Sequence, residues 1–299
     1  MTAARALELR GDELEVVILP DAGGRIHRIR GFGEDLLRTP DDPGAHARDP
    51  FSWGAYVMAP WCNRARPGPM DIAGRRVQLE PNFPDGTAIH GLVSSAPWGR
   101  EGERELAIRL DAGHAWPWAF EARQVATVEG ASMEVEYRLT NLEHAAPMPA
   151  GVGLHPWFRR PVELCVPAER AYASNSASPP EPAPVSGDLD LRSLRLPADG
   201  LDATLTALAE PRIDLAWPEL GVRARLEVKT DAAGVLVALA TPSGLDAIAV
   251  EPQTHGPDPL RRLEAGEPDA PDLLPPGASL VLSVRLTVER DRRAPPAYR

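Results

Sequence analysis

The chain has 299 residues, which is enough to bury a large core without disulfides or metals as braces. It carries 32 basic and 43 acidic side chains, and the net charge of −11 argues against nucleic acid and anionic membrane surfaces as partners. The 33 prolines favour a protein of strands and loops over one of long helices.

The apolar segments and the cysteines predict where the protein works. Segment 1–10 has no apolar core of signal-peptide length, and the longest strongly apolar run, near 235–240, is far too short to cross a bilayer. Cys62 and Cys165 lie far apart in the sequence, which favours two buried thiols in a reducing compartment over a disulfide. We therefore expect a cytoplasmic protein with no membrane partner.

Five segments alternate apolar and polar residues with a period of two, which is typical of antiparallel strands with one buried face. Turn signals at 129–130, 231–234 and 275–277 separate several of these runs. In chain order, the apolar faces are Leu14, Val16 and Ile18; Leu106, Ile108 and Leu110; Met133, Val135, Tyr137 and Leu139; Val222, Ala224, Leu226 and Val228; and Leu280, Leu282, Val284, Leu286 and Val288.

Helical patterns are scarce, and only segment 204–210 favours a short turn of helix. A parallel α/β fold needs repeated crossover helices, so we predict an all-β protein, a large antiparallel β-sandwich. A sandwich of this length often forms one unit, and we expect a single domain over 1–299. Its ordered core should span about 10–290, with a frayed, charged and proline-rich tail over 290–299.

Two titratable residues end apolar, strand-like runs and directly precede proline: His155 in 151–158 and Glu251 in 247–255. A residue before proline is driven into extended backbone, so both side chains should sit on stiff supports. A carboxylate at the edge of a core is costly unless it is paired, exposed or functional. A histidine and a carboxylate held in this way are the minimum equipment for acid/base chemistry on a small substrate.

Other polar residues have settings that suit a ligand. His90 precedes Gly91, which would let a ligand approach closely. Asn63 offers a donor and an acceptor, and Arg64 offers a planar fork of donors, which together suit sugar hydroxyl groups. The polar segments are flanked by Trp53, Trp61, Trp98 and Trp157, which fit carbohydrate stacking and core packing equally well. We interpret His27, His46, His114 and His144 as surface or structural residues, and His255, near Glu251, stays without a role.

Known nucleotide, dinucleotide, serine-hydrolase and zinc-protease motifs are missing from the sequence. Five segments, in this order, instead resemble the aldose 1-epimerase (galactose mutarotase) family. They are Asn63-Arg64, Ile89-His90-Gly91, 151–158, Leu201-Asp202 and 250–254.

This resemblance implies a β-supersandwich that binds a monosaccharide in an open cleft and interconverts its α and β anomers by acid/base ring opening. It implies Glu251 as general base and His155 as general acid. It further implies that sugar hydroxyl groups bind Asn63, Arg64, His90 and Asp202, without a metal or organic cofactor. The oligomeric state stays open between monomer and dimer.

Three positions depart from the family pattern: Trp157 stands where tyrosine is common, Leu205 where an aromatic is common, and Ala65 where isoleucine or leucine is common. These changes concern the choice of sugar and leave the acid/base pair intact.

Three alternatives stay open. An epimerase for hexose 6-phosphates would use arginines such as Arg64, Arg66, Arg75 and Arg76 for the phosphate. A sugar-binding module would need no acid/base pair. A two-histidine, one-carboxylate metal site could form from His90, His155 and Glu251.

Overall fold

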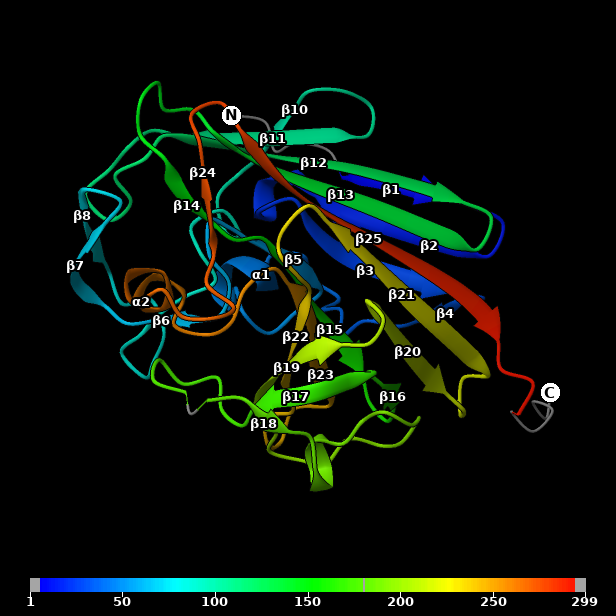
Figure 1. The fold of residues 1–299 in the computed structure, drawn as a ribbon. Coiled ribbons are helices and arrows are strands. Elements are labelled where there is room, and N and C mark those ends of the chain that lie inside the picture. The colour runs from blue at the N-terminus through cyan, green and yellow to red at the C-terminus, as the bar shows by residue number, and fades with distance from the viewer. Residues whose placement is uncertain (1–5, 180, 294–299) are drawn as a thin grey trace.

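The computed structural model describes residues 6–179 and 181–293. Over these residues two large antiparallel sheets, one of eleven strands and one of eight, make up most of the fold (Figure 1). The predicted all-β sandwich is confirmed. The two α-helices of this part of the chain, α1 (Ala45–Arg48) and α2 (Pro259–Ala265), are short.

The eleven-stranded sheet carries strands from both ends of the chain. Its strands lie in the order β1 (Leu7–Arg10), β2 (Leu14–Leu19), β3 (Arg25–Gly31), β5 (Ala55–Met58), β15 (Gly153–Arg159), β23 (Ala247–Gln253), β22 (Leu236–Ala240), β19 (Asp202–Leu208), β17 (Ala168–Tyr172) and β18 (Ala183–Pro184), and β4 (Glu34–Asp35) pairs with β3.

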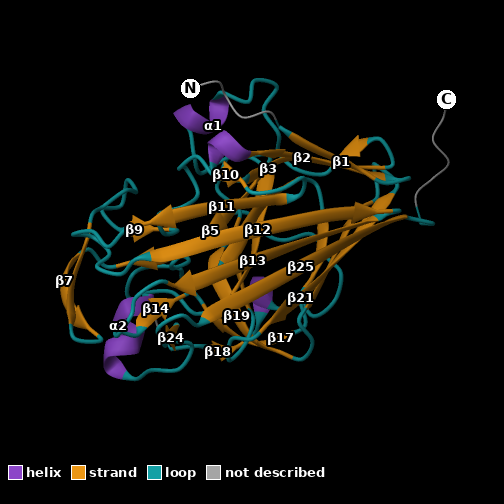
Figure 2. Ribbon diagram, turned by 90° about the horizontal axis from the view of Figure 1, so that it is seen from above, coloured by secondary structure: helices purple, strands orange, loops and turns teal. Residues whose placement is uncertain are grey.

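The eight-stranded sheet contains the longest strands. Their order is β10 (Gly99–Arg100), β11 (Glu105–Leu110), β12 (Phe120–Glu129), β13 (Ser132–Asn141), β25 (Ser279–Arg290), β21 (Val222–Thr230), β20 (Arg212–Trp217) and β16 (Glu163–Cys165). Smaller elements are the pairs β14 (Met148–Ala150) with β24 (Asp272–Leu274), β6 (Arg64–Ala65) with β9 (Ala88–Ile89) and β7 (Gly68–Ile72) with β8 (Arg75–Leu79), and the 3₁₀ turns Pro20–Ala22 and Gly187–Leu189. Figure 2 shows the long strands lying across those of the other sheet.

The predicted alternation is confirmed in β2, β13, β21 and β25, where buried residues alternate with more exposed ones. Apolar residues face apolar residues across the ladder, as Val135 does with Val284 and Tyr137 with Leu282. In β11 the strand is confirmed, but Ile108 and Leu110 are only half-buried.

The expected helical turn over 204–210 is wrong, because residues 204–208 belong to strand β19 and 209–210 form a bend after it. Thr204 and Thr206 are β-branched and favour extended backbone. β19 also lies between β17 and β22, which pair with its backbone on both sides. Tertiary pairing therefore overrides the weak local preference for helix.

The central strands of the eleven-stranded sheet are buried on both faces. On β5, β15 and β23, alternate residues such as Val57, Phe158 and Val250 join the main core between the sheets. The residues between them, such as Tyr56, Trp157 and Ala249, join a second, smaller cluster on the opposite face. His155 and Glu251 have the same parity as Trp157 and Ala249, so they too lie on the face that points away from the main core.

The remaining sequence expectations have mixed outcomes. Both cysteines are free, as predicted, but only Cys62 is buried, whereas Cys165 is half-buried. Strand β25 extends to Arg290 and Asp291 donates its N–H to the carbonyl of Gly221, so order reaches past the position where the tail was expected to begin. The rest of that tail, 294–299, lies outside the described residues.

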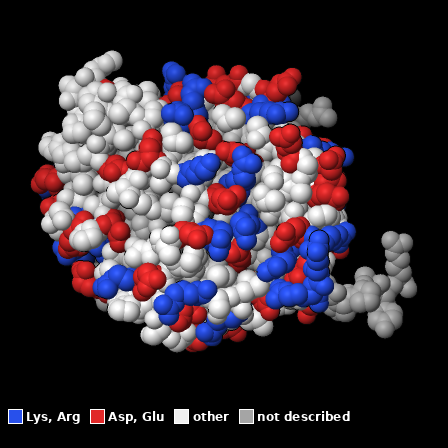
Figure 3. Space-filling model, turned by 45° about the vertical axis from the view of Figure 1, so that its right-hand side comes forward, with Lys and Arg blue, Asp and Glu red and all other residues white. Residues whose placement is uncertain are grey.

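Neither helix within 6–179 or 181–293 is long and apolar enough to span a bilayer. On the face shown in Figure 3, basic and acidic side chains are interspersed, so charges of opposite sign lie close together.

Candidate active site

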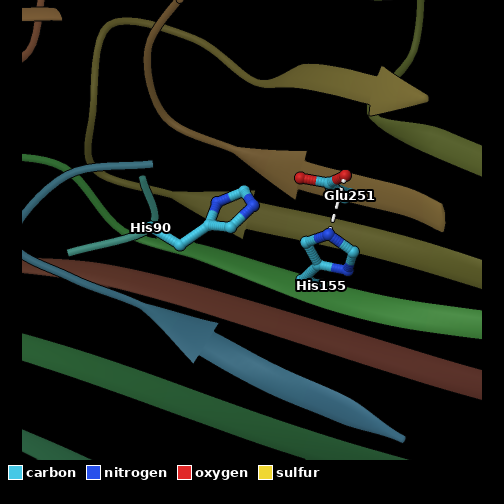
Figure 4. Close-up of side chains that lie close together, drawn as sticks. All are labelled: His90, His155 and Glu251. Carbon is cyan, nitrogen blue, oxygen red and sulfur yellow. Dashed lines mark ion pairs between the residues drawn. The ribbon is translucent and has the colours of Figure 1, made fainter. Parts of the chain in front are cut away.

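His155 and Glu251 meet because β15 and β23 are antiparallel neighbours. Gly153 pairs with Gln253 and Trp157 with Ala249, a register that puts His155 directly across from Glu251. The imidazole Nε2 lies 3.1 Å from the carboxylate Oε1 (Figure 4). The second carboxylate oxygen, Oε2, has no hydrogen-bond partner among the described residues. The pair is therefore in direct contact and keeps one acceptor for an incoming hydroxyl group.

The pair lies at a cavity of about 560 Å³, although each side chain is only 4% exposed. A cavity of this size is in the range of small-molecule sites. Every residue that the family resemblance assigned to catalysis or sugar binding lines it: Asn63, Arg64, His90, His155, Asp202 and Glu251. The structure thus brings together residues that lie up to 188 positions apart in the sequence, between Asn63 and Glu251.

Burial favours the uncharged forms of the central pair. It raises the pKa of Glu251 to about 8, with Asp202 adding to this and Arg64 opposing it. It lowers the pKa of His155 well below its usual value, with His90 and Arg25 adding to the effect. Both shifts act in the same direction and favour a neutral imidazole beside a protonated carboxyl group.

His90 forms one wall, and its tautomer is fixed by the backbone. Its Nδ1 accepts the N–H of Asn63 at 3.2 Å, so the neutral ring carries its proton on Nε2. Burial lowers the pKa of His90 to about 3, which keeps the ring neutral. Both residues have left-handed backbone, with φ of 60° at His90 and 58° at Asn63. Such strain in two neighbouring cavity residues is typical of functional sites.

A buried polar network holds the other wall and includes Asn175, which the sequence analysis missed. The Asn63 side-chain amide donates to Asn175 Oδ1 at 3.1 Å, and Asn175 donates to Asp202 Oδ1 at 2.9 Å. Thr204 donates to the same Asn175 oxygen at 2.5 Å. Asn175 follows β17 in a short polar segment, and no local pattern distinguishes it from an ordinary loop residue.

Arg64 is the one cation among the residues lining the cavity, and two carboxylates engage it. Its Nε donates to Asp85 at 2.8 Å, and an Nη atom lies 3.4 Å from Asp202. Its positive charge is therefore largely balanced before any ligand enters.

A sequence profile of the aldose 1-epimerases matches residues 5–180, which is more than half of the chain. The chain belongs to the aldose 1-epimerase family.

Two solved structures of 20% identity or less share the fold of this aldose 1-epimerase family member. A candidate aldose 1-epimerase of Escherichia coli K12 has a TM-score of 0.80 at 20% identity, over 96% of this chain and 99% of that one. A galactose mutarotase-like protein of Clostridium acetobutylicum has a TM-score of 0.80 at 15% identity, over 95% and 94%. These likenesses confirm the predicted galactose mutarotase-like supersandwich.

Among curated relatives, the plasmid form of protein LacX of Lactococcus lactis subsp. lactis is 30% identical over 146 residues. The match covers 45% of this chain and 48% of LacX, so the chain spans about half the length of that relative.

The tryptophans near the polar segments were compatible with either carbohydrate stacking or core packing, and the structure separates them. Trp157 lines the cavity of this family member, together with Phe51 and Phe83. Its ring N–H donates to the carbonyl of Phe51, which fixes the ring edge. Trp61 and Trp98 are 2% exposed and belong to the main core, so they pack rather than bind.

His255 supports the cavity from behind. It is fully buried, its Nδ1–H donates to the carbonyl of Gly256 at 2.7 Å, and its Nε2 accepts the N–H of Cys62 at 3.0 Å. A side chain at Gly151 would collide with the His255 ring, so this glycine provides the close approach. His255 thus fixes the backbone immediately before Asn63.

The metal alternative meets an obstacle at His90. One ligand atom from each of His90, His155 and Glu251 lies within 4.8 Å of the others, so their spacing is compatible with a cation. However, His90 Nδ1 already accepts the Asn63 N–H, which leaves the proton on Nε2. If a metal bound Nε2, the neutral ring would carry its proton on Nδ1, and that N–H would face the N–H of Asn63. The donor set therefore fits a hydrogen-bonding site better than a metal site.

Proposed function

We propose that the protein is a cofactor-independent aldose 1-epimerase that interconverts the α and β anomers of a free, uncharged monosaccharide. The main support is the direct contact between His155 Nε2 and Glu251 Oε1 at a cavity lined by hydroxyl-binding side chains. Ring opening needs one group that accepts the proton of the C1 hydroxyl and one that gives a proton to the ring oxygen. One proton that moves between Glu251 and His155 allows the first to act as the base and the second as the acid.

The proposed cycle begins with the proton moving from Glu251 to His155 across their 3.1 Å contact. Glu251 then takes the C1 hydroxyl proton while the imidazolium protonates the ring oxygen, and the C1–O5 bond breaks to leave an aldehyde. Rotation about the C1–C2 bond presents the other face of the carbonyl. Reclosure reverses both proton transfers, so the pair ends with the proton it began with.

Polar wall residues give the sugar its orientation in this proposal. The His90 Nε2–H is a donor of fixed direction, because the Asn63 N–H occupies the opposite ring nitrogen. Asp202 is half-exposed at the cavity and offers carboxylate acceptor capacity to a hydroxyl group. Trp157 and Phe51 supply flat apolar surfaces for the C–H faces of the ring.

Arginine pairing disfavours the hexose 6-phosphate alternative. Arg64 is engaged by Asp85 and Asp202, and the other arginines that the sequence offered pair elsewhere. Arg66 pairs with Asp258, Arg75 with Glu143, and Arg76 with Asp71. A phosphate would need at least one uncompensated cation, so an uncharged sugar fits the cavity better.

The decisive experiment measures anomer exchange by polarimetry and exchange NMR over a panel of aldoses, for wild type and Glu251→Gln. We expect accelerated mutarotation of at least one sugar and its loss in Glu251→Gln, with unchanged circular dichroism. Equal rates for the two proteins on every sugar would refute the proposal, and calorimetric sugar binding without rate enhancement would favour the binding-module alternative. Competition by inorganic phosphate would favour the hexose 6-phosphate alternative.

A further inference from the structure

Arg25, the first residue of β3, is a buried cation for which the proposed chemistry has no use. It is 1% exposed, and its guanidinium donates to three main-chain carbonyl groups: Trp53 at 2.8 Å, Pro50 at 2.7 Å and Ser94 at 3.4 Å. Burial lowers its pKa to about 10, so it stays charged at neutral pH. A cation is costly to bury, so its position beneath the cavity suggests a function.

The guanidinium lies behind the proposed catalytic imidazole. Its central carbon is 4.6 Å from the centre of the Tyr56 ring. Tyr56 in turn stacks on His155, with ring centres 4.4 Å apart and an angle of 22° between the planes. Tyr56 and His155 are also cross-strand partners on β5 and β15. Arg25, Tyr56 and His155 therefore form one column that ends at the cavity.

Arg25 also holds the loop that carries two cavity residues. Phe51 and Ser52 line the cavity, and each carbonyl from Pro50 to Trp53 accepts a side-chain hydrogen bond. The donors are Arg25 to Pro50, Trp157 and the Tyr56 hydroxyl to Phe51, Arg38 to Ser52, and Arg25 to Trp53. Side-chain hydrogen bonds thus hold the loop at four consecutive residues, and Arg25 donates those to the first and the last of them.

We propose that Arg25 is a positioning residue for the His155–Glu251 pair, acting on His155 through the Tyr56 ring and on the cavity wall through the carbonyl groups of Pro50 and Trp53. Its catalytic consequence rests on the proposed function, whereas its effect on the imidazole does not. A fixed positive charge behind His155 makes the imidazolium a stronger acid toward the ring oxygen.

The expected size of this effect follows from the distances in the column. Arg25 and the His155 ring are at most about 9 Å apart, given the 4.6 and 4.4 Å separations through Tyr56. A unit charge at that distance in a protein environment shifts a titration by about one pH unit. Other titratable or charged groups around the pair are His90, Tyr56, Cys62, Arg64 and Asp202, with Asp49 near Arg25.

The test is a histidine NMR titration, which does not depend on turnover. The His155 signal is identified by its loss in His155→Gln. In Arg25→Met the imidazole of His155 should gain its proton about one pH unit higher than in wild type. Arg25→Lys keeps the charge and should titrate like wild type. Arg38→Met is the matched control, because Arg38 fastens the same loop at Ser52 without joining the column.

Two results would overturn the inference: no shift in a folded Arg25→Met protein, or an equal shift in Arg38→Met. If Arg25→Met does not fold, Arg25→Gln replaces it, since the amide removes the charge but still donates to a carbonyl. If neither neutral variant folds, Arg25→Lys decides: an unshifted titration supports the inference and a shifted one overturns it. When a mutarotation substrate is available, both limbs of the pH–rate profile should also move to higher pH in Arg25→Met. Absence of mutarotation in wild type would refute the proposed function and leave the NMR result standing.

Discussion

The two sheets of this protein bury their strands differently. In the eight-stranded sheet, β13 and β25 alternate buried and more exposed residues along most of their length. In the eleven-stranded sheet, β5 and β23 are buried at every position and β15 at every position except its last. One sheet thus has a single covered face, whereas the centre of the other is covered on both.

This difference locates the proposed chemistry. An antiparallel sheet normally leaves one face to solvent, so a strand without alternation signals a second covering layer. Here that layer consists of the small cluster around Tyr56 and Trp157 and of the cavity walls. His155 and Glu251 occupy the second face of such strands, where a titratable side chain is removed from water yet accessible to a ligand. The eight-stranded sheet packs against the other face of these strands across the main core.

The largest expected effect is a difference in mutarotation rate between two variants, each with one substitution in a different sheet. Under the proposed mechanism, His155→Gln removes a proton-transfer group and should lower the catalysed mutarotation rate by about 10²- to 10⁴-fold. Tyr137→Phe in β13 should leave the rate unchanged, because the Tyr137 hydroxyl is buried without a hydrogen-bond partner in the described part of the chain. Rates are measured by polarimetry at equal concentrations of folded protein. Similar losses in both variants would contradict the division of roles.

A core truncation should give the opposite pattern. Leu282→Ala in β25 removes a fully buried side chain and should lower the free energy of unfolding by about 2–5 kcal/mol. The rate per folded molecule should stay near that of wild type. The control is Val125→Ala in β12, where the side chain is exposed and the cost should be below about 0.5 kcal/mol. Urea denaturation measures both, and equal costs would argue against the assigned core.

Acid should loosen the eleven-stranded sheet and its loops first. Burial lowers the pKa values of His46 and His90 to about 3 and that of His255 to about 4. A depressed pKa gives stability that is present above pH 6.5 and lost as the pH falls toward 3–4. For His255 the loss should reach about 3 kcal/mol. Hydrogen exchange is measured at pH 7 and pH 4.5 relative to the intrinsic rate at each pH. On going to pH 4.5, amides near these residues should lose more protection than those in β13 and β25.

Glu251 should contribute with the opposite sign. Its raised pKa of about 8 gives stability that is present below about pH 4.3 and lost as the pH rises through 8. Glu251→Gln should therefore be less sensitive than wild type to a rise from pH 6 to pH 9, as followed by the urea midpoint. An unchanged pH dependence in this variant would contradict the assigned burial effect.

The smallest expected effect concerns the charge balance at Arg64. Asp85→Asn removes one of its two carboxylates while keeping an acceptor for Thr87. The Asp85 side chain is 40% exposed, and partly exposed ion pairs contribute only about 0–1 kcal/mol, so inhibition by inorganic phosphate should strengthen by less than about fivefold. Inhibition assays at low ionic strength provide the measurement. Strong phosphate inhibition of wild type itself would overturn the view that Arg64 is already neutralised.

Local sequence patterns were sufficient to predict the long strands of the eight-stranded sheet. The alternation in β13, β21 and β25 predicted these strands, because a half-buried strand must place apolar residues at every second position. The order of short motifs predicted six residues that all line the same cavity. Local patterns failed for β19, where neighbouring strands outweighed a weak helical preference.

Only the tertiary structure decided the electrostatic character of the candidate site. The sequence placed His155 and Glu251 before prolines, but their contact depends on the β15–β23 register, and the raised pKa of Glu251 depends on burial from both faces of the sheet. Asn175 and Arg25 have no distinctive local pattern, and their roles come from partners brought close by folding. Desolvation and charge–charge interactions depend on distances in space, which sequence spacing does not specify.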